Sequence, residues 1–290
     1  MSISVLILIV MTAVGLVFGF ILAFANKKFA IEVNPLIHLV EDVLPKGQCG
    51  ACGYAGCAKY AEAVVLNPDV PPNLCIPGKE PIAKLVAELT GKAAAAVEPR
   101  IAQVRCAGTA AKAVKAYQYK GVQDCAAASL LLGGGKECKY GCLGLGTCVN
   151  NCPFGALSLS AEGLPIVDPD KCTGCGKCET VCPKKVIALV PLTSRVRVNC
   201  NSHDKGPVAK KACGAACIGC SLCMRSCPHG AIKMDNNLAT VDVHVCAEKC
   251  TDAVCLAKCP TKAIRPAVFG IVPGTETEAS VQAVCSSCSK

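Results

Sequence analysis

The distribution of apolar residues changes sharply near the start of the chain. Residues 3–25 carry no charged side chain, and a helix of that length spans roughly 34 Å, enough to cross a bilayer. Lys27 and Lys28 follow at once, and no Lys or Arg precedes the segment. The positive-inside rule then predicts a single-pass anchor, residues 1–26, in the cytoplasmic (inner) membrane, with the N-terminus outside and the remaining chain in the cytoplasm.

A cleaved signal peptide is the alternative interpretation, because Ala23-Phe24-Ala25 resembles a small-residue cleavage site. Such a peptide needs a basic N-terminal region, and residues 1–4 contain no basic side chain. The pattern therefore favours the anchor.

Beyond the anchor, apolar residues recur at helical spacing in two segments. The first begins at Asn34-Pro35, a helix-start signal, and ends at Pro45; the second covers residues 79–90 and ends at Gly91. Together they predict a small helical domain over residues 27–91. The alanine-rich start of residues 92–130 predicts a connecting segment.

Further along, two short stretches of alternating residues predict hairpins. Residues 156–159 and residues 231–234 each precede a turn and a second alternating stretch. They indicate two similar units, residues 131–195 and 196–268, followed by a tail, residues 269–290. The predicted fold class is α+β: one transmembrane helix, a small helical domain and two ferredoxin-like units.

Composition explains how such a chain could be stable. Cysteines number 26, while aromatic residues make up only 4% of the sequence and Trp is absent. Cross-links must supplement a poor aromatic core, and disulfides, zinc or iron–sulfur clusters are the three choices. The predicted cytoplasmic location argues against disulfides.

The first cysteine group lies within the helical domain. Its spacing is C-x2-C-x4-C-x17-C, and the glycines at 47, 50, 53 and 56 let the backbone fold around a bound group. The ligand candidates are Cys49, Cys52, Cys57 and Cys75. Four thiolates would also suit zinc, so this group alone leaves both choices open.

The two predicted units carry a more specific signal. The spacing C-x2-C-x2-C-x3-C-P occurs twice, starting at Cys172 and at Cys217. In bacterial ferredoxins the first three cysteines of this run hold one cluster and the fourth holds its neighbour. A looser companion precedes the first run, starting at Cys138, and another follows the second run, starting at Cys246.

Crossed ligation between each run and its companion predicts four more sites. The sets are Cys138, Cys142, Cys148 and Cys182; Cys152, Cys172, Cys175 and Cys178; Cys217, Cys220, Cys223 and Cys259; and Cys227, Cys246, Cys250 and Cys255. With the first group, five [4Fe-4S] clusters are expected. No catalytic residue is predicted.

Six cysteines remain: Cys106, Cys125, Cys200, Cys213, Cys285 and Cys288. They are either free thiols or, for the first four, candidate ligands of a sixth cluster. The formal charge of +9 does not indicate nucleic-acid binding, because each cluster with its four thiolates adds about two negative charges.

These motifs resemble those of the B subunit of the Rnf complex, a membrane-bound ferredoxin:NAD oxidoreductase that couples electron flow to Na+ or H+ transport. The resemblance covers the whole chain: an uncharged anchor followed by NKKFAIEVNP, then LPKGQCGACGYAGCAKYAEA, GCLGLGTCVNNCPFGA and the two cysteine runs. The family's shorter members carry one two-cluster domain, whereas this chain has two such units.

The resemblance implies an electron-transfer subunit of a translocase-type oxidoreductase, with no complete active site of its own. Its partners would be soluble ferredoxin, the other Rnf subunits and the membrane. Two alternatives remain open: a ferredoxin-type subunit of another membrane oxidoreductase, and a zinc-binding scaffold without a redox role.

Overall fold

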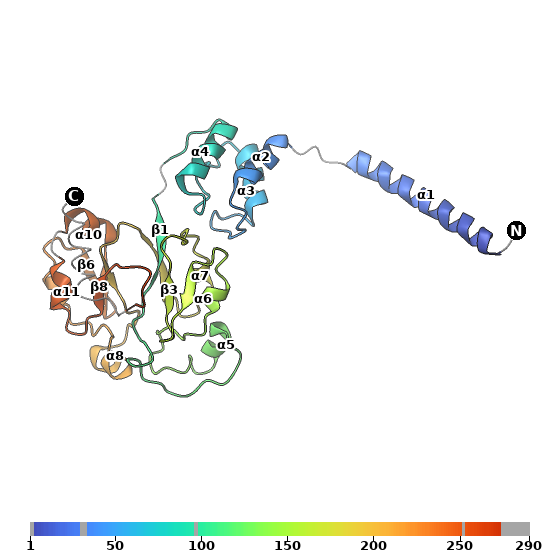
Figure 1. Ribbon diagram of the computed structural model, residues 1–290. Helices are drawn as coiled ribbons and strands as arrows, with labels where there is room; N and C mark the ends of the chain where they lie inside the picture. Colours follow the sequence, from blue (N-terminus) through green and yellow to red (C-terminus); the bar gives the residue numbers. More distant parts are fainter. Residues whose placement is uncertain (1–2, 30–33, 96–97, 251–252, 274–290) are drawn as a thin grey trace.

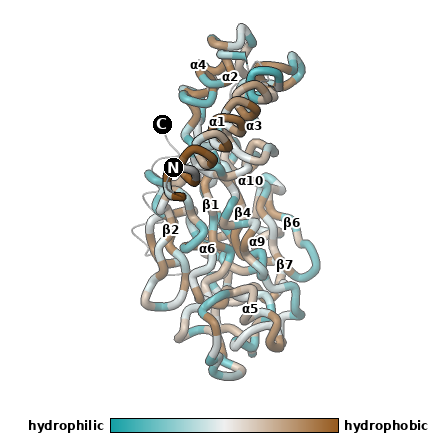
Figure 2. The backbone as a smooth tube through the Cα atoms, turned by 90° about the vertical axis from the view of Figure 1, so that its right-hand side faces the viewer, coloured by the Kyte–Doolittle hydropathy of each residue, from teal (hydrophilic) through white to brown (hydrophobic). Residues whose placement is uncertain are grey.

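The computed structural model describes residues 3–29, 34–95, 98–250 and 253–273. Its first element is the helix α1 (Ile3–Phe29), which extends away from the rest of the chain (Figure 1). Within residues 3–28 an 18-residue stretch has a mean hydropathy of 3.0, and this apolar stretch is not buried against the rest of the protein; Figure 2 colours the helix as hydrophobic. By length and composition it is a candidate membrane span, which confirms the predicted apolar N-terminal helix.

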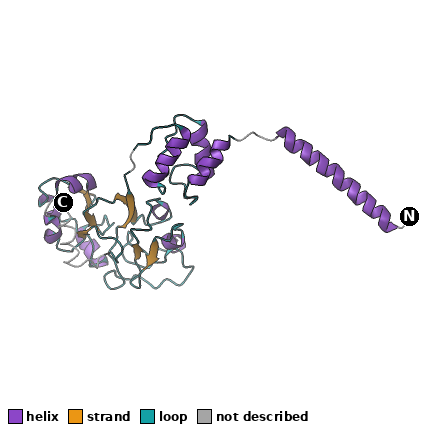
Figure 3. Ribbon diagram, turned by 45° about the horizontal axis from the view of Figure 1, so that its top comes forward, coloured by secondary structure: helices purple, strands orange, loops and turns teal. Residues whose placement is uncertain are grey.

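Three helices form the first folded part: α2 (Pro35–Val43), α3 (Cys57–Leu66) and α4 (Lys79–Thr90). Asn34 caps α2 by accepting a hydrogen bond from the backbone N–H of Leu36 at 3.0 Å, and Gly91 ends α4 in the left-handed conformation. Figure 3 shows these helices gathered apart from the strands. Their core is formed by Val40, Tyr60, Val64 and Val86, all at most 1% exposed.

Lys92 stabilises the C-terminal end of α3 and the loop that follows it. Its Nζ donates hydrogen bonds to the carbonyl oxygens of Val64, Asn67 and Val70 at 2.6, 2.6 and 2.8 Å. A cation at a helix C-terminus compensates carbonyls that have no partner within the helix.

The rest of the chain is built from two-stranded antiparallel sheets and short helices. In the first unit β1 (Arg100–Val104) pairs with β4 (Ile187–Pro191), and β2 (Leu157–Leu159) pairs with β3 (Pro165–Val167). In the second, β5 (Val196–Val198) pairs with β8 (Ile264–Pro266), and β6 (Ile232–Asp235) pairs with β7 (Leu238–Val241). The two predicted hairpins are therefore present, and in each unit the first strand pairs with the last.

Short helices occupy the connections. The first unit contains α5 (Cys125–Leu130), α6 (Thr147–Asn150) and α7 (Lys177–Thr180). The second contains α8 (Gly206–Ala212), α9 (Leu222–Arg225), α10 (Val243–Lys249) and α11 (Val254–Lys258).

Residues 92–130 are more than the connecting segment that the sequence suggested. They supply β1, which is buried from Ile101 to Val104, and α5. β1 and β4 pair with each other in a two-stranded sheet that is separate from the β2–β3 hairpin. At the other end, the start of the tail returns to the first unit, where the N–H of Gly270 donates to the carbonyl of Val167 at 2.8 Å.

Candidate iron–sulfur sites

The first cysteine group lies around the loop between α2 and α3. Gln48 organises this loop, because its Oε1 accepts a hydrogen bond from the N–H of Cys57 at 2.9 Å, at the start of α3. Burial raises the pKa of Cys75 to about 11, and the thiols of Cys57, Cys49 and Cys52 add to that shift. The structure thus brings the four predicted residues of this group together.

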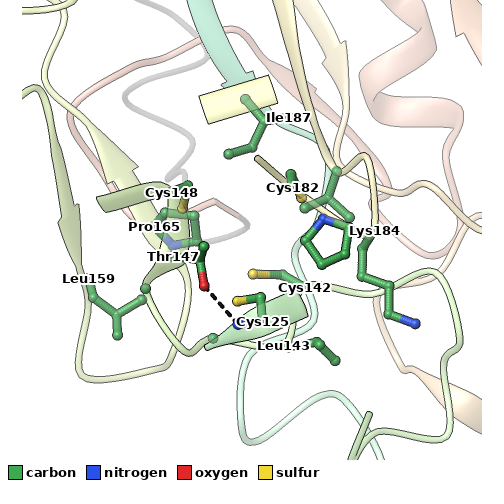
Figure 4. A pocket seen from close by; sticks show the side chains of 14 residues that line it. Cys125, Cys142, Leu143, Thr147, Cys148, Leu159, Pro165, Cys182, Lys184 and Ile187 are labelled. Carbon is green, nitrogen blue, oxygen red and sulfur yellow. Dashed lines mark hydrogen bonds between the residues drawn. The ribbon is translucent and has the colours of Figure 1, made fainter. Parts of the chain in front are cut away.

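A pocket in the first unit is bordered by four cysteines from three segments. They are Cys125, Cys142, Cys148 and Cys182, which Figure 4 shows around the pocket. Cys125 is positioned by two hydrogen bonds: its N–H donates to Thr147 Oγ1 at 2.7 Å, and Thr147 Oγ1 donates to Asp124 Oδ2 at 2.9 Å. Asp124 in turn caps α5.

This grouping differs from the predicted set in one residue. Cys138 was expected beside Cys142, Cys148 and Cys182, but Cys125 borders the pocket instead. Consistent with this, burial raises the pKa of Cys148 to about 11, and Cys125 and Cys182 are the thiols that add to the shift.

The residue register explains the difference. Aligned without gaps, the loop CLGLGTC (residues 142–148) matches the loop CTGCGKC (residues 172–178), with Leu145 where the second loop has Cys175. The two backbones agree, since φ is +78° and +77° at Gly144 and Gly146 and +72° and +78° at Gly174 and Gly176. Glycine adopts this left-handed region without the steric cost that a Cβ adds. The loop of residues 142–148 thus has the form of the second loop but lacks its middle cysteine, and Cys125 is the fourth cysteine at the pocket.

A second pocket of the first unit is bordered by Cys152, Cys172, Cys175 and Cys178. Burial raises the pKa of Cys178 to about 12, and neighbouring thiols add to the shift. The N–H of Ala156 donates to Cys152 Sγ at 3.3 Å, a type of contact that tunes bound clusters. The grouping joins Cys152 to the later cysteine loop, as crossed ligation requires.

The second unit repeats this arrangement. Cys217, Cys220, Cys223 and Cys259 border one pocket. In the other group, burial raises the pKa of Cys255 to about 12, with Cys246, Cys250 and Cys227 adding to the shift. Both groups have the composition expected from crossed ligation.

The donor sets suit iron–sulfur clusters. Each set has four cysteines, the number that a [4Fe-4S] cluster uses, and the 24 cysteines of the described residues are all free thiols. Among the described residues, no three Cys, His, Asp or Glu side chains converge on one point as a single ion requires. Sets spread around a space fit a multinuclear group better than zinc, whose thiolates lie about 2.3 Å from the ion.

Cys106, Cys138, Cys200 and Cys213 lie elsewhere, between the two units. The N–H of Cys142 donates to Cys106 Sγ at 3.4 Å, and the N–H of Ser202 donates to Cys200 Sγ at 3.5 Å. Cys285 and Cys288 lie outside the described residues.

Three protein-family models match parts of the chain. They are "Putative Fe-S cluster" over residues 44–77, "4Fe-4S dicluster domain" over residues 137–186 and "4Fe-4S binding domain" over residues 215–233. These matches support an iron–sulfur cluster in the helical part and [4Fe-4S] clusters in both units.

Curated relatives extend the similarity to nearly the whole chain. The B subunit of the proton-translocating ferredoxin:NAD(+) oxidoreductase complex of Clostridium ljungdahlii is 60% identical over 93% of this chain and 95% of its own length. The B subunit of an ion-translocating oxidoreductase complex of Methanosarcina acetivorans is 43% identical over 88% of this chain and 95% of its own. The B subunit of the Na(+)-translocating ferredoxin:NAD(+) oxidoreductase complex of Acetobacterium woodii is 40% identical over 86% of this chain and 74% of its own.

The long shared sequence and the cysteine geometry lead to the same conclusion. The chain belongs to the family of the B subunits of ion-translocating (Rnf) oxidoreductase complexes, and it is an iron–sulfur electron-transfer subunit.

Proposed function

We propose that this chain relays electrons, one at a time, between reduced ferredoxin and the other subunits of an Rnf-type ferredoxin:NAD oxidoreductase complex. A [4Fe-4S] cluster supplies one-electron redox chemistry whose potential depends on charge, hydrogen bonds and solvent exposure. The protein's part is to hold such clusters in sequence and to shield them from water.

We assign five ligand sets from the cysteine groups. They are Cys49, Cys52, Cys57 and Cys75; Cys152, Cys172, Cys175 and Cys178; Cys125, Cys142, Cys148 and Cys182; Cys217, Cys220, Cys223 and Cys259; and Cys227, Cys246, Cys250 and Cys255. Burial raises the pKa of eight of these thiols, so cluster binding must displace their protons; the eight are Cys75, Cys142, Cys148, Cys175, Cys178, Cys223, Cys246 and Cys255.

The observation that carries the proposal is the adjacency of successive groups. Cys49 is close enough to Cys175 to contribute to its raised pKa, whose main cause is burial. In the same way, Cys148 contributes to the raised pKa of Cys178, and Cys223 contributes to that of Cys255. An electron relay needs this succession, whereas a zinc scaffold does not.

The helical part contacts the first unit at the point where such a relay would cross. A side-chain Cβ at Gly47 would lie 2.8 Å from Cζ of Phe154, so only glycine allows the loop and the ring to approach this closely. Gly47 precedes Cys49 by two residues, and Phe154 borders the pocket of Cys152 and Cys175. This contact supports electron passage between the two groups.

Membrane orientation is part of the proposal. Lys27 and Lys28 lie in the last turn of α1, and the positive-inside rule would place them, and the cysteine groups that follow, on the cytoplasmic side. There the chain would meet soluble ferredoxin.

Reduction of the loaded protein by ferredoxin tests the function. The full chain in detergent, reconstituted without oxygen, should contain at least about 20 iron atoms from the five sets. Reduced ferredoxin in catalytic amount, regenerated by an enzymatic system, should then bleach its visible absorbance. An iron content near 8, zinc in stoichiometric amount, or an absorbance that ferredoxin leaves unchanged would contradict the proposal.

A further inference from the structure

Every described cysteine outside the five sets lies in one place, at the junction of the two units. The four are Cys106, Cys138, Cys200 and Cys213. Cys106 follows β1 and Cys200 follows β5, while Cys213 ends α8 and Cys138 precedes the loop of Cys142. Each of the four thiols thus comes from a different segment of the chain.

Gly108 locates two of the sulfurs. A Cβ built on this buried residue would lie 3.5 Å from Cys106 Sγ and 3.5 Å from Cys213 Sγ. The two sulfurs are therefore no more than twice that distance apart, and the direction of a side chain at Gly108 points toward both.

Electrostatic proximity places the other two thiols beside Cys106. Burial raises the pKa of Cys138 and of Cys213, and raises that of Cys200 to about 12. In all three cases the thiol of Cys106 adds to the shift, and Cys138 also contributes to that of Cys213. Cys106 is thus the common neighbour of the group.

Backbone contacts hold the four segments together. Ala113 forms an antiparallel bridge with Cys213, and Lys115 forms another with Lys136, two residues before Cys138. The N–H of Ala107 donates to the carbonyl of Asn199 at 3.0 Å, which fastens Cys106 beside Cys200. The junction is therefore a built structure and not a chance approach of two surfaces.

The surroundings suit an anionic, sulfur-ligated group. Two backbone N–H groups point at its sulfurs, from Cys142 to Cys106 at 3.4 Å and from Ser202 to Cys200 at 3.5 Å. Lys136 Nζ donates to the carbonyl of Gly108 at 2.8 Å. Its charge lowers the pKa of Cys213 against the larger, opposing effect of burial.

We propose that Cys106, Cys138, Cys200 and Cys213 bind a sixth [4Fe-4S] cluster between the two ferredoxin-like units. The site rests on the proposed electron relay and completes it. The N–H contact from Cys142 to Cys106 links it to the set of the first unit. On the other side, Cys200 is a close neighbour of Cys217, whose backbone N–H and thiol both act on the Cys200 thiol. This proximity links the proposed site to the set of the second unit.

Iron content of the full-length protein tests the site directly. The reconstituted protein should contain about 24 iron atoms, from six clusters of four. Changing Cys106→Ser and Cys213→Ser together should remove about four, because both residues serve one cluster. The matched double variant Cys213→Ser with Cys220→Ser leaves three cysteines at each of two sites, so it should give two three-iron clusters and remove only about two iron atoms. An iron content near 20 in the unchanged protein, or an equal loss in the two double variants, would overturn the proposal.

A single variant keeps the test informative if the double variants fold poorly. Cys138 is only half-buried, and Cys138→Ser leaves three cysteines at the site, an arrangement that should yield a three-iron cluster with its own paramagnetic resonance signal in the oxidised protein. Absence of that signal, or one zinc per chain at this site, would refute the iron–sulfur assignment. Because ferredoxin should still bleach the first unit, failure of the sixth site and failure of the relay can be told apart.

Discussion

At the scale of single residues, the first unit shows how a ligand can be moved without changing a loop. Leu145 takes the place of a cysteine, yet the backbone of residues 142–148 keeps the left-handed glycines of its partner loop. In the proposed set the fourth thiol comes from Cys125, which is positioned by the hydrogen bonds from its N–H to Thr147 and from Thr147 to Asp124. A site of this kind depends on the support of one capped helix.

Pairs of substitutions can reveal which cysteines share a cluster. Cys125→Ala with Cys182→Ala should cost about four iron atoms, because both border the same pocket. Cys125→Ala with Cys152→Ala should cost only about two, because Cys152 borders the other pocket and each set keeps three cysteines, which suffice for a three-iron cluster. Iron and acid-labile sulfide, measured without oxygen, distinguish the two. The reverse order of losses would mean local ligation and contradict the crossed arrangement.

At the scale of elements, the sequence predicted most of the structure through regular spacing. Alternating residues predicted the two hairpins, and the bacterial run, with its Cys-Pro end, predicted the groups that contain Cys172 and Cys217. Neither pattern could indicate β1, because five residues of mixed character acquire a strand partner only some eighty residues later, in β4. The sequence named Cys125 only as a candidate ligand of a sixth cluster, because its place beside Cys142, Cys148 and Cys182 follows from three-dimensional contact, although the Leu145 alignment is readable from sequence.

The fastening of α3 by Lys92 can be tested at this scale. Lys92→Met keeps the length of the side chain but removes three charge-assisted hydrogen bonds, and it should lower the free energy of local opening by about 2 kcal/mol. Amide hydrogen exchange near the end of α3 should then become at least about tenfold faster in the loaded protein.

Lys84→Met is the matched control. Lys84 is exposed and pairs with Glu80 on the surface of α4, a contact of small value. Similar exchange rates in both variants would mean that Lys92 does not hold the helix.

At the scale of the whole molecule, an apolar helix is joined to a body rich in cysteine. Proteolysis of membrane vesicles tests which side that body occupies. Inside-out vesicles should lose the cysteine-rich part to protease, and right-side-out vesicles should protect it, because the lysines after the span favour the cytoplasm. The opposite pattern, seen by immunoblot with an intact-vesicle marker as control, would reverse the assigned topology.

The pairing of first with last strand also has a consequence for synthesis. As the chain leaves the ribosome, the buried residues of β1 find no partner until β4 has emerged, and β5 must wait in the same way for β8. Contacts so distant in sequence form slowly, because the intervening loop must close first. A newly made unit therefore stays open while its thiols are still accessible, and the maturation machinery has its natural opportunity to deliver iron and sulfide before the last strand closes the unit.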